Sequence, residues 1–198
     1  MKKLVFFIGI LFTFFTPVKS DAYSNDPKQF ISEIVVEAKK ILNSNLDKES
    51  KAKKLGTIAL NTVDIKGIGY YTLGNYRKSL EQEEMEKYLK IFEKYFIKSF
   101  TSRLTDHSNP KIDVLDAEVL NPKYTIVKSI LLATTERPEV KIDWRVYTKN
   151  PDKPLIRDLI VEGLSLARTQ KEEFTSVIES NNGEVTKLFV TLQEFIDK

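Results

Sequence analysis

The side chains best placed to do chemistry in this sequence are three carboxylates in its last third. Asp143 lies in one predicted strand, and Asp158 and Glu162 lie in the next. Two acids at alternate positions of one strand can share a face and act as a proton donor and acceptor. Such acids more often pair with arginine, and Arg145 and Arg157 are close in sequence. We therefore expect Asp158 to be a buried structural carboxylate that binds backbone amides or arginines, and we expect the chain not to be an enzyme.

Other catalytic and metal-binding patterns are missing from the sequence. It has no cysteine and one histidine, His107, in a polar turn, which excludes the common zinc and thiol sites. It has no nucleophile elbow and no phosphate loop. The glycines of Gly67-Ile68-Gly69 lack the third glycine of a dinucleotide-binding fingerprint. We expect no metal and no cofactor.

The carboxylates belong to a region with the patterns of β-strands. Residues 140 to 147 alternate between apolar and polar types, and a turn-rich segment around Pro151 and Pro154 follows them. A strand is expected from Leu155 to Leu166, and its centre is apolar on both faces, so both sides should be covered. Two earlier strands are expected over residues 114 to 120 and 124 to 134. Four strands joined by short turns predict an antiparallel meander.

Helices are expected before and after these strands. Asp26 with Pro27, Asp47 and Ser79 are the predicted starts of three amphipathic helices. The third carries a wide apolar stripe of seven side chains: Met85, Tyr88, Leu89, Phe92, Tyr95, Phe96 and Phe100. Helical spacing returns after Ser165, and a final helix is expected from about residue 183 to 196. Helices, then strands, then helices predict an α+β domain.

The first 22 residues have the features of a secretory signal peptide. Lys2 and Lys3 precede an apolar run from Leu4 to Thr16, and small residues near Ser20 and Ala22 suit cleavage. This leader holds three of the 31 basic residues and one of the 28 acidic residues. The remaining 28 basic and 27 acidic residues are nearly balanced, which gives no sign of nucleic-acid binding. We expect export, and a single domain over residues 23–198.

Three motifs resemble the MlaC family, also called the toluene-tolerance auxiliary family. They run from Arg157 to Ser165, from Lys171 to Phe174 and from Tyr70 to Gly74. The resemblance implies a curved antiparallel sheet of about four strands covered by helices, NTF2-like, with an apolar cavity between sheet and helices. It also implies a soluble periplasmic phospholipid carrier. Such a carrier moves lipid between an inner-membrane ABC transporter complex, which has a lipid-binding membrane-anchored subunit, and an outer-membrane lipoprotein complex.

On this interpretation, the cavity is lined by apolar side chains from the aromatic helix, the 70–74 segment and the strands. They are Tyr70, Tyr71, Leu73, Tyr88, Phe92, Phe96, Ile130, Leu132, Trp144, Val146, Leu159 and Val161. Residue parity fixes which strand positions share a face, but it does not say which face binds lipid. The alternative is a periplasmic interaction or assembly module whose core is fully packed and holds no ligand.

Overall fold

The computed structural model describes residues 23–106, 110–135 and 137–198. The predicted leader and the turn with His107 lie outside these residues. Among them, no helix combines the length and the hydrophobicity needed to span a bilayer.

Helices flank a block of strands, so the predicted α+β class is confirmed. The helices are α1 (Pro27–Leu42), α2 (Lys48–Thr62), α3 (Ile65–Thr72), the 3-10 helix η1 (Gly74–Lys78), α4 (Gln82–Thr105), α5 (Leu166–Ser180) and α6 (Val185–Asp197). The strands are β1 (Ile112–Asn121), β2 (Tyr124–Leu131), β3 (Val140–Tyr147), β4 (Leu155–Val161) and β5 (Leu164–Ser165).

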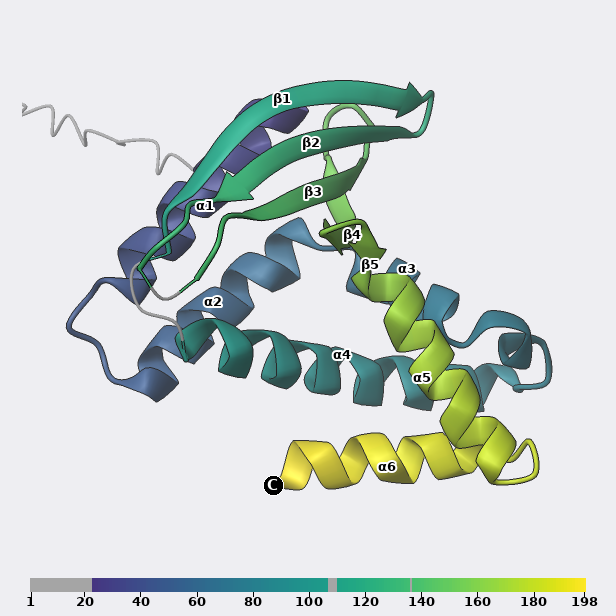
Figure 1. Cartoon of the computed structure of the whole chain (residues 1–198). Coiled ribbons are helices and arrows are strands. Elements are labelled where there is room, and N and C mark those ends of the chain that lie inside the picture. Colours follow the sequence, from purple (N-terminus) through teal and green to yellow (C-terminus); the bar gives the residue numbers. More distant parts are fainter. Residues whose placement is uncertain (1–22, 107–109, 136) are drawn as a thin grey trace, which may run out of the picture.

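The five strands form one curved antiparallel sheet in the order of the sequence, as a meander predicts. Figure 1 shows the sheet at the top with α1 behind it, and α4 and α6 below. Helix α5 runs from the end of the sheet down to α6, and α2 lies on the other side between α1 and α4 (Figure 1).

The predicted strand from Leu155 to Leu166 is wrong in its second half. The chain turns at Glu162 and Gly163, whose φ angles are 49° and 83°. Val161 then pairs with Leu164 across a two-residue hairpin, and positive φ at both central residues is the mark of a type I′ turn. Because Glu162 lies in this turn, it does not share a strand face with Asp158. The two carboxylates therefore lack the arrangement that the acid–base hypothesis requires.

Two of the three predicted helix starts are confirmed. The Asp26 carboxylate accepts from the Gln29 amide at 2.8 Å, and the Asp47 carboxylate accepts from the Ser50 amide at 2.8 Å. The prediction of Ser79 as the cap of α4 is wrong. Glu81 takes that position in a capping box with Glu84. Ser79 is instead part of the turn that closes η1.

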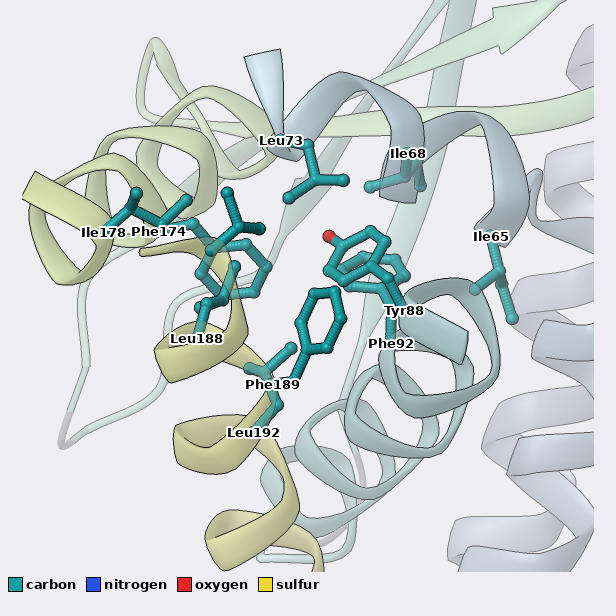
Figure 2. Packing of buried hydrophobic residues seen from close by; sticks show 11 residues of the cluster. Ile65, Ile68, Leu73, Tyr88, Phe92, Phe174, Ile178, Leu188, Phe189 and Leu192 are labelled. Atoms are coloured by element: carbon teal, nitrogen blue, oxygen red, sulfur yellow. The ribbon is translucent and has the colours of Figure 1, made fainter. Parts of the chain in front are cut away.

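The interior is divided into two apolar clusters. The helical cluster is built from α3, α4, α5 and α6, and Figure 2 shows its side chains converging around Tyr88 and Phe92. The sheet cluster joins α1 and α2 to one sheet face through residues such as Phe30, Val127 and Val146. Val63 packs against both clusters.

The two faces of the sheet differ in character. Val127 and Val146 are fully buried and point toward α1 and α2. The neighbouring positions on β2 and β3, Lys128 and Asp143, point the other way. Lys128 pairs with Glu118 of β1 at 2.9 Å on that outer face. The face toward α1 and α2 is therefore the apolar one, whereas the outer face combines charged side chains with Ile126, Ile130 and Ile160.

We predict that Gly163→Ala destabilises the fold by about 1–3 kcal/mol, because a Cβ is strained at its φ of 83°. Urea unfolding followed by circular dichroism measures the change. Leu164→Ala in the same turn is the control, since that side chain is exposed. Equal stability of Gly163→Ala and the parent protein would contradict the turn assignment.

Candidate functional site

Asp158, the strongest chemical candidate in the sequence, is a structural anchor. It is 4 % exposed. One carboxylate oxygen accepts from the Ser165 hydroxyl at 2.6 Å, and the other accepts from the Ala167 amide at 3.0 Å. The Arg145 guanidinium lies 3.4 Å from the same carboxylate. The prediction that Asp158 binds backbone amide and arginine is therefore confirmed, and its contacts fix the start of α5 on β4.

A second polar link ties α3 to the sheet. Arg145 pairs with Asp158 and Val146 pairs with Ile156, so Arg157 is an extra residue in β4, and such bulges redirect side chains. The Arg157 guanidinium lies 2.6 Å from the carboxylate of Asp64 through both Nε and Nη2. Asp64 also caps α3 by accepting from the Gly67 amide at 2.9 Å.

Two tyrosines complete this link. Arg157 lies 3.6 Å above the Tyr147 ring and donates to the Tyr124 hydroxyl at 3.0 Å. Burial lowers the pKa of Arg157, but its bonds to Tyr124 and Asp64 outweigh that effect and raise the pKa above its ordinary value. Sequence reasoning missed this cluster, because a bulge leaves no pattern in a single sequence.

A pocket of about 380 Å³ lies next to these arginines, between α3, the β1–β2 turn and the start of α5. Its lining residues are Gly67, Ile68, Tyr71, Leu120, Asn121, Tyr124, Arg145, Arg157, Asp158 and Ala167. Ile68 belongs to the helical cluster, whereas Tyr71 and Leu120 are 45 % and 54 % exposed. The pocket therefore has a buried apolar side, exposed apolar residues and a cationic wall.

The predicted lining residues from the helices fall into two groups. Leu73, Tyr88 and Phe92 are buried in the helical cluster, and Phe96 packs against it. Tyr70 and Tyr71 lie at the surface of α3, beside Lys66 and Lys171 respectively. Tyr71 lines the pocket of about 380 Å³.

The buried Tyr88 hydroxyl is fully accounted for. It lies 2.9 Å from the Thr72 hydroxyl and donates to the Gly69 carbonyl at 3.3 Å. Burial raises the pKa of Tyr88 above its ordinary value. This side chain is therefore neutral at all physiological pH values. Its hydroxyl links α4 to α3 by hydrogen bonds within an apolar core.

The predicted strand residues do not all share one face. Trp144, Val146, Leu159 and Val161 lie on the face toward α1 and α2, and Val146 is fully buried there. Ile130 lies on the opposite face, because it and its partner Lys141 are an odd number of positions from Val127 and Trp144, and side chains alternate along a strand. Leu132 lies beyond the end of β2. The structure therefore does not bring Ile130 and Leu132 together with the other four strand residues.

Helix α4 connects the two clusters. Tyr88 and Phe92 belong to the helical cluster, and Leu104 near its other end packs on the sheet cluster. Between them, the half-buried rings of Phe96 and Phe100 stack with centroids 5.9 Å apart. Helix α4 packs on α2, α3 and α6, whereas the sheet packs on α1, α3 and α5. Helix α3 packs on both α4 and β4, and α2 links α4 to the sheet cluster.

Comparison with known proteins gives the family. A family model described as MlaC protein matches residues 31–194. The chain belongs to the MlaC family. No curated relative matches the sequence.

One solved structure has the same fold as this MlaC-family chain. It is a phospholipid-binding protein from Ralstonia solanacearum in complex with a phospholipid. The two chains superpose with a TM-score of 0.71 at 20% sequence identity, and the match covers 84% of this chain and 94% of the other. The described residues of this MlaC-family chain contain no group of three or more histidine, cysteine or acidic side chains placed to hold a metal ion.

We predict that Asp158→Asn lowers the free energy of unfolding by about 1.5–3 kcal/mol, the usual worth of hydrogen bonds to a charged group. The amide cannot accept from all three of its donors. Asp143→Asn, on the neighbouring strand and only half-buried, is the control and should change stability by less than about 0.5 kcal/mol. Chemical denaturation measures both, and equal effects would show that Asp158 is no anchor.

Proposed function

We propose that this protein is a periplasmic phospholipid carrier that binds acyl chains between α4 and the apolar face of the sheet. The match to the MlaC family over residues 31–194 carries the proposal. The shared fold with a protein solved in complex with a phospholipid supports it.

Side chains that are apolar but only partly buried support this position for the acyl chains. Leu159 and Val161 are half-buried on the same sheet face as Trp144. Phe96 and Phe100 are half-buried on α4 and continue the stripe of Phe92, which lies against α3 near Gly69. We assign these five side chains to the acyl site: Phe96, Phe100, Trp144, Leu159 and Val161.

This assignment narrows the set predicted from sequence. Leu73, Tyr88, Phe92 and Val146 are already fully packed, so they support the lining and do not need lipid to cover them. Phe100 is an addition, and its spacing of four residues from Phe96 and eight from Phe92 was visible in the sequence.

Binding and release then depend on hydrophobic burial. Two acyl chains with ~30 methylenes would gain on the order of 20 kcal/mol gross, at ~0.8 kcal/mol for each buried methylene. A gain of that size opposes spontaneous release. Transfer therefore requires a docked partner that opens the site or offers the chains another apolar path.

Membership of the family suggests the compartment in which the protein works and the partners to which it docks. We propose that residues 1–22 direct export, with cleavage near residues 20–22, and that the 23–198 domain works in the periplasm. Its partners would be an inner-membrane ABC transporter complex with a lipid-binding membrane-anchored subunit and an outer-membrane lipoprotein complex.

We predict that the purified protein carries one phospholipid. Native mass spectrometry followed by organic extraction measures the cargo, because noncovalent lipid survives the first step and is identified in the second. A lipid-free mass, together with no uptake from labelled liposomes, would overturn the carrier proposal. The protein would then be better described as a ligand-free interaction or assembly module.

We predict that Leu159→Trp lowers lipid occupancy in a folded protein, because a larger ring would fill the proposed acyl site. Ile160→Trp is the matched control, since Ile160 is the next residue of β4 and faces the other side. Lipid extraction from both variants, with circular dichroism to check folding, measures the effect. Equal occupancy in the two variants would place the lipid elsewhere. Val146→Trp is a poorer test, because Val146 is fully buried in the sheet cluster.

A further inference from the structure

The pocket of about 380 Å³ contains an arginine whose hydrogen-bonding groups are not used up. Arg145 meets Asp158 only through Nη1, at 3.4 Å. Its Nε is buried and has no hydrogen-bond partner within the part of the chain that the structure describes. The rest of the side chain is accessible, since 38 % of it is exposed and Arg145 lines the pocket.

Other donors line the same pocket. The Tyr124 hydroxyl accepts from Arg157, which leaves its own hydrogen to donate. The side-chain oxygen of Asn121 accepts from the Lys123 amide, so its amide nitrogen remains as a donor. Arg157 uses three of its five N–H groups to bind Asp64 and Tyr124, so two remain as donors. Each of these side chains lines the pocket with Arg145.

The acids near the pocket are already occupied. Asp158 accepts from Ser165 and Ala167 in addition to its pairing with Arg145. Asp64, which faces Arg157, also caps α3. Lys171 lies 5.5 Å from the ring centroid of Tyr71, a residue of the pocket wall, and adds positive charge there. Three cations therefore stand against two engaged carboxylates.

We propose that this pocket binds a phosphate group, with the exposed part of the Arg145 guanidinium as the main contact and Tyr124, Asn121 and Arg157 as further donors. Planar guanidinium groups bind phosphate oxygens through two parallel hydrogen bonds. The pocket is separate from the acyl site proposed above, because Arg145 and Tyr124 lie on the outer sheet face and Trp144 and Leu159 lie on the inner one. The inference does not require the carrier proposal to be right.

The test is a calorimetric titration with inorganic phosphate of the protein after co-purified lipid has been removed. We expect saturable binding of one phosphate per chain. Arg145→Gln should weaken it by about tenfold or more, the equivalent of one charge-assisted hydrogen bond. Arg145→Lys keeps the charge beside Asp158 but lacks the fork, so it should restore only part of the affinity. A purely structural role of Arg145 would not produce this ranking.

Lys128→Gln is the matched control, because Lys128 is a cation on the neighbouring strand and on the same face but outside the pocket. It should leave phosphate binding unchanged. No saturable binding by the lipid-free parent protein, or equal losses in Arg145→Gln and Lys128→Gln, would overturn the proposal even if the protein carried lipid when it was purified.

A second titration identifies the source of the phosphate. The protein is first loaded from phosphatidylglycerol vesicles and then titrated with inorganic phosphate. Loss of phosphate binding after loading supports the pocket and assigns it to the lipid headgroup. Unchanged binding after loading also supports it and assigns it to free phosphate.

Discussion

The fold depends on one buried carboxylate. Asp158 fixes the first turn of α5 to β4 through Ser165 and the Ala167 amide, and it holds Arg145 of β3 in place. A buried charge is costly unless it is hydrogen-bonded and paired, so these contacts must form together. Because α5 then runs from the sheet to α6 (Figure 1), the anchor sets how the helical cluster stands relative to the sheet. Asp158, the strongest catalytic candidate in the sequence, therefore has a structural role: it connects β3, β4 and α5.

A second joint stands beside the first. Asp64 begins α3 and binds Arg157 of β4, while its backbone amide donates to the Ile156 carbonyl at 2.9 Å. Both links lie at β4, and Arg157 and Asp158 line the same pocket. The sheet and the helical cluster are thus joined at β4 and through α4, while Leu159 and Phe96 stay only half-buried. Apolar side chains left incompletely covered in this way are what a carrier of acyl chains needs.

The polar and apolar features divide the work of such a protein. The inner sheet face offers apolar area for burial but does not orient a ligand, because hydrophobic burial has no preferred geometry. The pocket at Arg145 buries little area but orients its ligand, because the hydrogen bonds of a guanidinium group fix the position of an anion. A lipid has both kinds of group, but the two sites stand on opposite faces of the sheet. One lipid could occupy both sites only if it reached around the edge of the sheet; otherwise the two sites bind two different ligands.

The sequence by itself determined the class of the fold, most of its elements and the family. The starts of α1 and α2, the meander and the structural role of Asp158 followed from local patterns, because caps and strand periods depend on neighbours in the chain. The cap of α4, the turn at Glu162 and Gly163 and the bulge at Arg157 were missed or misplaced. Only the tertiary structure decided which strand face is buried, why Ile130 and Trp144 are separated, and that two arginines meet at one pocket. These depend on pairing register and on contacts between residues such as Asp64 and Arg157, which are 93 positions apart, and no local pattern records such contacts.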